Sequence, residues 1–124
     1  MRLGHQGQDV PEFKWENPEE TLKAFLRMYK EIGLTILHPS VNSFTEVFAN
    51  GLTFHQMVRK YWDGTIIGVG NLHPAAASQV IAEGTIDLAA FGRPLLANPN
   101  FIQQIKNRTM LETYDASLHL KHLY

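Results

Sequence analysis

The sequence predicts an α/β protein built from parallel βα units. An amphipathic helical pattern, followed by a glycine and then by a short apolar run, occurs three times along the chain. Strands of a parallel sheet are covered by helices, so they read as nearly continuous apolar runs instead of alternating ones. A length of 124 residues, 44% of them hydrophobic and 19% charged, is ordinary for a single globular domain.

The first βα unit is expected to follow a strand stub and a long loop over residues 1–16, which contain Gly4, Gly7 and Pro11. A helix is predicted to begin at Asn17 as N-cap, with Pro18 at the first helical position and Glu20 at N3. Its apolar positions have helical spacing and are Leu22, Phe25, Leu26 and Tyr29. Gly33 ends this helix, and a short strand is expected over residues 34–37, terminated by His38 and Pro39.

The second and third units repeat this order. The second helix has its apolar stripe at Phe54, Met57, Val58, Tyr61 and Trp62. Gly64 ends it, and residues 65–69 are expected to form a strand. The third helix is predicted from Pro74 to Glu83, and Gly84 separates it from a strand over residues 85–91. Asn98 and Pro99 are expected to cap a last helix that runs to about Lys106.

A glycine motif follows each of two consecutive predicted strands, and this pattern predicts half of a phosphate-binding site. Gly68-Val69-Gly70-Asn71 ends one strand, and Phe91-Gly92-Arg93 ends the next. Glycine lets a phosphate approach the backbone, and arginine can bind phosphate oxygens bidentately. The pattern GxGxxG is incomplete here because its third glycine is missing, and GxxxxGK[ST] is absent from the sequence. A Rossmann site and a P-loop are therefore poorly supported.

Composition narrows the expected partners and location. The net charge is −1 and acidic and basic residues are interspersed, so neither a nucleic acid nor a membrane surface is an expected partner. The chain has no cysteine and no apolar run of about 20 residues, which favours a cytoplasmic protein. His119 and His122 form an HxxH pattern without an evident third ligand, so no metal site is expected. His38 and His73 each precede a proline, where capping a helix or filling space is the more common role.

The chain resembles the C-terminal half of the old yellow enzyme family, FMN-dependent ene-reductases built on a (βα)8 barrel. The residues that carry the resemblance are Met1-Arg2-Leu3, Leu37-His38-Pro39-Ser40, Ile66 to Pro74, and above all Leu88 to Pro99 with its Phe-Gly-Arg and Ala-Asn-Pro. It implies about four βα units of a TIM barrel, present as a single partial-barrel domain over residues 1–124. Within it, residues 1–16 are the strand stub and loop, 17–106 the βα units and 107–124 a C-terminal tail. The chain would begin inside the fifth strand, as a fragment of a longer gene or a truncated relative.

The resemblance also implies a cofactor site. Gly70 and Asn71 match the backbone contacts to the FMN phosphate, and Gly92 and Arg93 complete the contacts to that phosphate. Arg2 matches the arginine at the pyrimidine edge of the isoalloxazine, where a positive charge stabilises the reduced flavin. Gly4-His5 replaces the family's Ser-Pro, and His119 stands where the family has a tyrosine. The pair that binds the substrate carbonyl and the tyrosine that protonates the alkene belong to the other half of the barrel, so the catalytic residues are unknown.

Two functions follow as hypotheses. In the first, the chain carries the phosphate half of an oxidoreductase whose FMN takes hydride from NAD(P)H and reduces an activated alkene, a small-molecule substrate. In the second, it is a non-catalytic half-barrel remnant or interaction module that binds at most a phosphate or FMN. A fragment of a phosphosugar barrel enzyme is a weaker third alternative. Because four strands cut from a barrel expose two edges and an apolar face, a homo-oligomer or a complementing half barrel is expected.

Overall fold

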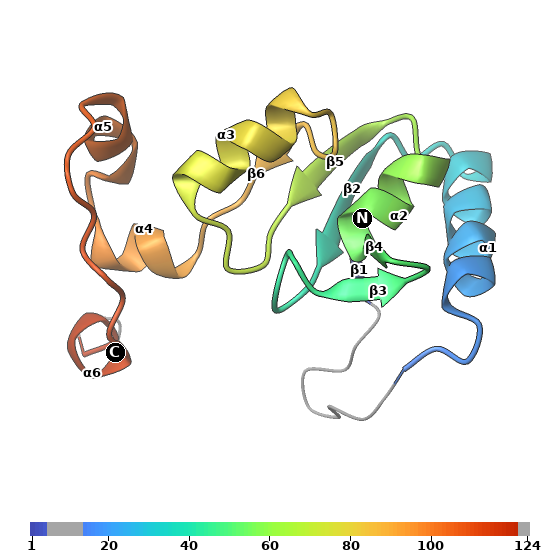
Figure 1. Ribbon diagram of the computed structural model, residues 1–124, viewed down its shortest axis with the longest axis horizontal. Coiled ribbons are helices and arrows are strands. Elements are labelled where there is room, and N and C mark those ends of the chain that lie inside the picture. Colours follow the sequence, from blue (N-terminus) through green and yellow to red (C-terminus); the bar gives the residue numbers. More distant parts are fainter. Residues whose placement is uncertain (5–13, 122–124) are drawn as a thin grey trace. The chain divides into compact units, whose positions relative to one another are not determined.

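The computed structural model describes residues 1–4 and 14–121, which form two compact units, Met1–Ala90 and Phe91–Tyr124 (Figure 1). The prediction of a single domain over residues 1–124 stays a prediction. The loop predicted after Gly4, including His5, lies outside the described residues, and so does His122 of the HxxH pattern.

A parallel sheet of four strands forms the centre of the first unit and confirms the predicted α/β class. The strands are β1 (Arg2–Gly4), β2 (Ile36–Ser40), β5 (Thr65–Gly68) and β6 (Leu88–Ala89), and they lie in the order β1-β2-β5-β6. All three pairings are parallel, with Arg2 opposite His38, Ile36 opposite Thr65 and Ile67 opposite Leu88. The strands follow one another in the sheet in the same order as in the chain. Strands that are neighbours in the sheet are therefore connected through a helix, as in a series of βα units.

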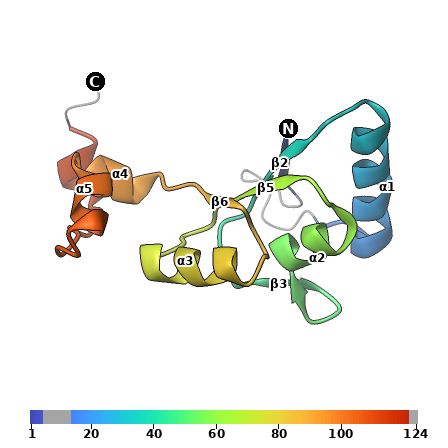
Figure 2. The same ribbon diagram turned by 90° about the horizontal axis from the view of Figure 1, so that it is seen from above.

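Three helices accompany the sheet, α1 (Pro18–Glu31), α2 (Phe54–Tyr61) and α3 (Pro74–Ala82), and α2 and α3 lie on the same side of it (Figure 2). Asn17 occupies the N-cap position of α1 as expected, but its side chain makes no capping hydrogen bond. Its backbone, at φ −120° and ψ 78°, lies outside the extended region that N-cap residues usually adopt. Thr53 and Gln56 form a capping box on α2, and His73 caps α3 by accepting from the Ala75 amide.

Two strand predictions need correction. The strand expected over residues 34–37 runs instead from Ile36 to Ser40 and includes Pro39, which was expected to end it. Proline fits because the ladder with β5 stops at Leu37, so no neighbour on that side needs an amide from Pro39. The strand expected over residues 85–91 is limited to Leu88–Ala89.

A β-hairpin that the sequence analysis did not predict connects β2 to α2. Its strands are β3 (Val47–Ala49) and β4 (Leu52–Thr53), and Asn50 and Gly51 form the turn with φ of 51° and 74°. An Asn-Gly pair with two positive φ angles is the preferred two-residue hairpin turn.

The two faces of the sheet differ in burial. Leu3, Leu37 and Ile66 are at most 6% exposed, and they pack on the face that the helices cover. Side chains alternate between faces along a strand, so the other face carries the residues between them. We call it the open face, and its residues are Arg2, Ile36, His38, Ser40, Thr65, Ile67 and Leu88. Ile36 and Leu88 on the open face remain 49% and 55% exposed.

The second unit is helical in its described part, with α4 (Arg93–Ala97), α5 (Phe101–Lys106) and α6 (Ala116–His119). The last predicted helix ends at Lys106 as expected, but its N-cap is Asn100 and not Asn98. Asn98 instead ends α4 and turns its side chain to residue 112, which explains the error. Over the described ranges, 1–4 and 14–121, the structure contains no helix with the length and apolarity that crossing a membrane requires.

Candidate functional site

The turn after β5, residues 69–71, carries the first half of the predicted phosphate site, and we call it the Gly70 turn. Gly70 has φ of 130° and Asn71 has φ of 53°. Glycine adopts such angles without strain, and asparagine is among the residues that tolerate the left-handed region. A Cβ on Gly70 would lie 2.7 Å from the Phe44 amide nitrogen and 2.7 Å from Cγ2 of Val41. Both the backbone angle and the space therefore require glycine at this position.

The backbone amides of the Gly70 turn suit an anion. Neither the Gly70 nor the Asn71 N–H donates a hydrogen bond to any residue in the described part of the chain. Gly70 is buried and Asn71 is exposed. A backbone donor that lacks a protein partner needs water or a ligand in its place. The turn thus fits the role that the FMN phosphate contacts require.

Two hydrogen bonds, one with Phe44 and one with His55, hold the Gly70 turn in place. The Phe44 amide donates to the Gly70 carbonyl oxygen at 2.8 Å, and the Val69 amide donates to Nε2 of His55 at 3.4 Å. The Phe44 and His55 rings stack with their centroids 4.4 Å apart. His55 is fully buried. Neither residue could be predicted from the sequence, because their contacts with residues 69 and 70 depend on the tertiary fold.

Arg2 lies on the open face, beside a histidine. Its Nη2 donates to Oγ of Ser40 at 2.8 Å, and its strand neighbour across β1 and β2 is His38. Burial, with a further contribution from the Arg2 charge, lowers the pKa of His38. Nε2 of His38 is buried and has no hydrogen-bond partner within residues 1–4 and 14–121. The open face therefore presents one fixed guanidinium next to a largely neutral imidazole.

Gly92 and Arg93 belong to the second unit. Gly92 is the N-cap residue of α4, and a Cβ built on it would meet no atom within 4 Å. Arg93 is exposed and its guanidinium makes no hydrogen bond or ion pair with another described residue. These two residues are accessible to an anion. That they bind the same phosphate as the Gly70 turn stays a prediction.

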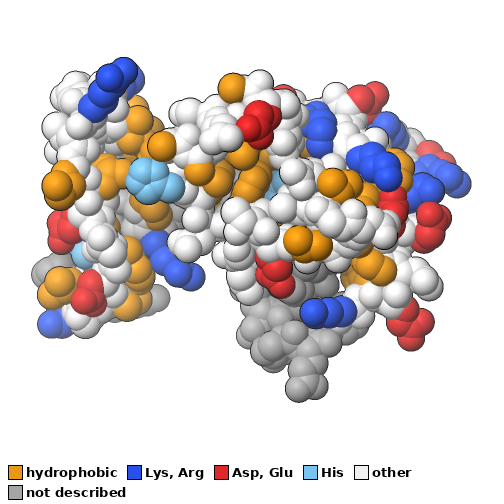
Figure 3. Space-filling view, in the orientation of Figure 1, with side chains coloured by type: hydrophobic (Ala, Val, Ile, Leu, Met, Phe, Trp, Pro, Cys, Tyr) orange, Lys and Arg blue, Asp and Glu red, His pale blue; other side chains and the backbone are white. Residues whose placement is uncertain are grey.

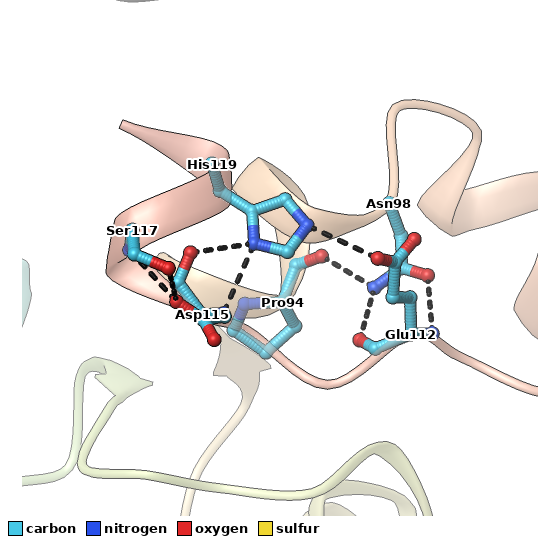
Figure 4. Close-up of polar contacts among 6 residues, drawn as sticks. All are labelled: Pro94, Asn98, Glu112, Asp115, Ser117 and His119. Atoms are coloured by element: carbon cyan, nitrogen blue, oxygen red, sulfur yellow. Dashed lines mark hydrogen bonds and ion pairs between the residues drawn. The ribbon is translucent and has the colours of Figure 1, made fainter. Parts of the chain in front are cut away.

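Asn98 is the centre of a polar cluster that fixes the C-terminal segment of the second unit (Figure 4). It is 2% exposed, and its amide nitrogen donates to the carbonyl oxygens of Pro94 and Glu112 at 2.9 Å each. Its amide oxygen accepts from the Glu112 N–H at 2.8 Å. His119 lies beside this contact, with Nε2 3.4 Å from Oε1 of Glu112. The Asn in Ala-Asn-Pro therefore ends α4 and holds residue 112, and it does not cap α5.

Charged side chains of the described residues lack the arrangement that a metal site requires. On the visible face of the first unit, acidic and basic side chains are interspersed (Figure 3). No group of three or more His, Cys, Asp or Glu side chains in the described ranges has the arrangement of a metal site.

Comparison with known proteins identifies similar chains. The model of the NADH:flavin oxidoreductase / NADH oxidase family matches residues 4–112. 12-Oxophytodienoate reductase 2 of Arabidopsis thaliana is 28% identical over 104 residues, which are 82% of this chain and 28% of the reductase. The old yellow enzyme of Trypanosoma cruzi is similar in structure, with a TM-score of 0.77, 22% identity, and coverage of 95% of this chain and 30% of that one.

A structure of morphinone reductase in complex with tetrahydroNAD is also similar, with a TM-score of 0.75 and 25% identity. The match covers 94% of this chain and 30% of the reductase. The chain therefore spans less than a third of the length of each of these three relatives. The likeness confirms that its fold is part of the old yellow enzyme barrel.

Proposed function

The chain belongs to the NADH:flavin oxidoreductase / NADH oxidase family, and from this premise we propose that it binds FMN through the phosphate. Gly70 and Asn71 donate their backbone amides to the phosphate, and Gly92 and Arg93 complete the contact. The observation that carries the proposal is the Gly70 turn, whose two amides have no partner in the described part of the chain. The positive φ of Gly70 and the exposed Arg93 guanidinium support it.

Arg2 is the second part of the proposed site. Bound FMN would supply hydride transfer, which no side chain of this protein can perform. Arg2 places a permanent positive charge on the open face, and its hydrogen bond to Ser40 fixes the guanidinium there. A fixed cation favours the flavin in its reduced, more negative form.

The reaction proposed for the assembled protein is reduction of an activated alkene by NAD(P)H. Support comes from the similarity to a 12-oxophytodienoate reductase and to morphinone reductase, whose structure contains tetrahydroNAD. The catalytic residues are not assigned to this chain. A cytoplasmic location stays a prediction from the sequence.

The partner that we propose is a second copy of the chain or a complementing half barrel. The open face leaves Ile36 and Leu88 about half exposed, and β1 and β6 are the outer strands of the described sheet. Apolar surface and unpaired strand edges of this kind favour pairing with another sheet. The Gly70 turn equally supports the second candidate function, a half barrel that binds phosphate or FMN and does not catalyse.

A flavin titration tests these proposals. The purified chain is titrated with FMN and, as a matched ligand without phosphate, with riboflavin, while quenching of flavin fluorescence is followed. Saturable binding with a clear preference for FMN supports the phosphate site, and oxidation of NADPH by the same sample supports the oxidoreductase. Binding without turnover favours the non-catalytic half barrel. Failure to bind either flavin contradicts FMN binding by this chain.

A further inference from the structure

The Gly70 turn is fixed by two peptide groups, one on each side of Gly70. The first peptide joins Gly68 to Val69. Its carbonyl oxygen accepts from the Ala90 amide at 2.8 Å, and its N–H donates to His55 Nε2 at 3.4 Å. A trans peptide is planar, and its C=O and N–H point in opposite directions. Ala90, which directly follows β6, and His55 on the other side therefore determine the orientation of this peptide.

The second peptide joins Gly70 to Asn71. Its carbonyl oxygen accepts from the Phe44 amide at 2.8 Å. Because the peptide is planar, its N–H points away from Phe44. That N–H is the Asn71 amide, which is one of the two donors proposed for the phosphate. The contact with Phe44 thus turns the Asn71 donor outward.

His55 joins the two contacts into one unit. Its ring stacks on Phe44 with centroids 4.4 Å apart while its Nε2 accepts from Val69. To accept at Nε2, the neutral imidazole must carry its proton on Nδ1. The ring comes from the first turn of α2, where the capping box of Thr53 and Gln56 fixes the backbone. The capped first turn of α2 therefore carries a ring that contacts the Phe44 ring and the Val69 amide at the same time.

We infer that His55 is a positioning residue for phosphate binding: through Phe44 and Val69 it holds the Gly70 turn with the Asn71 amide directed outward. This inference rests on the proposed FMN function. His55 itself does not contact the phosphate. It keeps the backbone amides of the Gly70 turn in the orientation for binding before the anion arrives. Without it, these amides would have to be ordered when the anion binds.

The test compares His55→Leu with His55→Gln in the full chain. Glutamine places an acceptor oxygen near the position of Nε2, whereas leucine fills space without an acceptor. We expect His55→Leu to speed hydrogen exchange of the Val69 amide about tenfold and to weaken FMN binding about tenfold. Riboflavin binding should stay unchanged, and His55→Gln should restore both values to within about threefold of the wild type.

Leu26→Ala serves as the control, because Leu26 is a buried residue of α1. It removes core packing and should lower stability without changing the ratio of FMN to riboflavin affinity. Unchanged Val69 exchange and FMN affinity in His55→Leu would overturn the inference, and so would an equal loss of FMN and riboflavin binding. A wild-type chain that binds neither flavin contradicts the proposed function itself, and Val69 exchange then reports the contact with His55 independently of any ligand.

Discussion

At the scale of single residues, the candidate site depends on backbone geometry more than on reactive side chains. Gly70 combines a positive φ with a Cβ position already filled by Phe44 and Val41. Asn71 adopts the left-handed conformation directly after it. Two such residues in succession aim amides at a common region instead of back into a strand. For the candidate site, the backbone conformation of Asn71 therefore matters more than its side chain.

Gly70→Ala is expected to destabilise the first unit by about 3 kcal/mol, because a Cβ would be strained at this φ and would overlap the Phe44 amide. FMN binding should be lost with it. Gly84→Ala is the matched control, since Gly84 has φ of 80° but nothing within 4 Å of its Cβ position. It should cost only the backbone strain, about 1 kcal/mol, in urea denaturation. Equal losses in the two variants would contradict the steric part of this explanation.

At the scale of elements, Arg59 and Asp87 link the end of α2 to the starts of β5 and β6. Arg59, near the end of α2, donates to the carbonyl oxygens of Trp62, Gly64 and Thr85 and pairs with Asp87 at 2.5 Å. Asp87 also accepts from the Ile66 amide at 2.8 Å. These contacts surround the starts of β5 and β6, at the end of the strands opposite the Gly70 turn. The Asp87 amide also donates to the Ile66 carbonyl oxygen at 2.9 Å, so Asp87 joins the start of β6 to β5 through both its backbone and its side chain.

Asp87 should make folding sensitive to acid. The hydrogen bond from the Ile66 amide, with help from Arg59, lowers the pKa of Asp87 below its ordinary value. A carboxylate whose pKa is lowered in the folded state contributes stability above its unfolded pKa, and this is lost as the pH falls through the folded pKa. Asp87→Asn should therefore lose less stability than the wild type between pH 6 and pH 3 in urea denaturation. Glu31→Gln is the control, and a wild-type-like pH dependence in Asp87→Asn would refute the assignment.

Asn98→Ala should free the segment that follows α5. The change leaves the Glu112 amide and the Glu112 carbonyl oxygen without the Asn98 side chain as partner, which costs about 2 kcal/mol in a buried site. The Pro94 carbonyl oxygen keeps the backbone amide of residue 98 as donor. We expect faster hydrogen exchange at Glu112 and earlier proteolytic cleavage near residues 108–114. Asn100→Ala should change neither by much, because the Asn100 side chain makes no capping hydrogen bond. Retained protection at Glu112 would contradict the role given to Asn98.

Which elements could be predicted from the sequence depended on how local their signals are. Helix α1 was predicted closely because proline, helical spacing and Gly33 all lie within the segment itself. The hairpin was missed although Asn50-Gly51 is a local signal for it. The Gly70 turn was located from its glycines, but the support from Phe44 and His55 was not. No spacing rule connects residue 55 to residue 69, since that contact exists only after α2 packs beside β5.

At the scale of the whole molecule, the described sheet has one covered face and one open face. The covered face buries Leu37 and Ile66 completely, and the open face leaves Ile36 and Leu88 about half exposed. The relatives with the same fold are more than three times as long as the part that this chain matches. The proposed second copy or complementing half would cover this face.

Ile36→Glu and Leu88→Glu should therefore reduce self-association, because a carboxylate on the open face would be buried without a partner in the assembly. Analytical ultracentrifugation of the wild type and of both variants measures this. Ile32→Glu, at a position that is 65% exposed at the end of α1, is the control and should associate like the wild type. A wild-type chain that sediments as a single monomeric species, alone and with a complementing half barrel, would rule out the proposed partner.

The agreement between strand order and chain order also has a consequence for folding kinetics. The paired residues Arg2 and His38 are 36 positions apart, Ile36 and Thr65 are 29 apart, and Ile67 and Leu88 are 21 apart. The free-energy cost of loop closure is therefore lower for pairing β5 with β6 than for pairing β1 with β2, by about 0.5 kcal/mol. Pairing of β5 with β6 therefore has the lowest entropic cost of loop closure. We expect this pair to form first and the sheet to grow from it toward β1. The strand that ends in the Gly70 turn would then be among the first to be ordered in the transition state for folding.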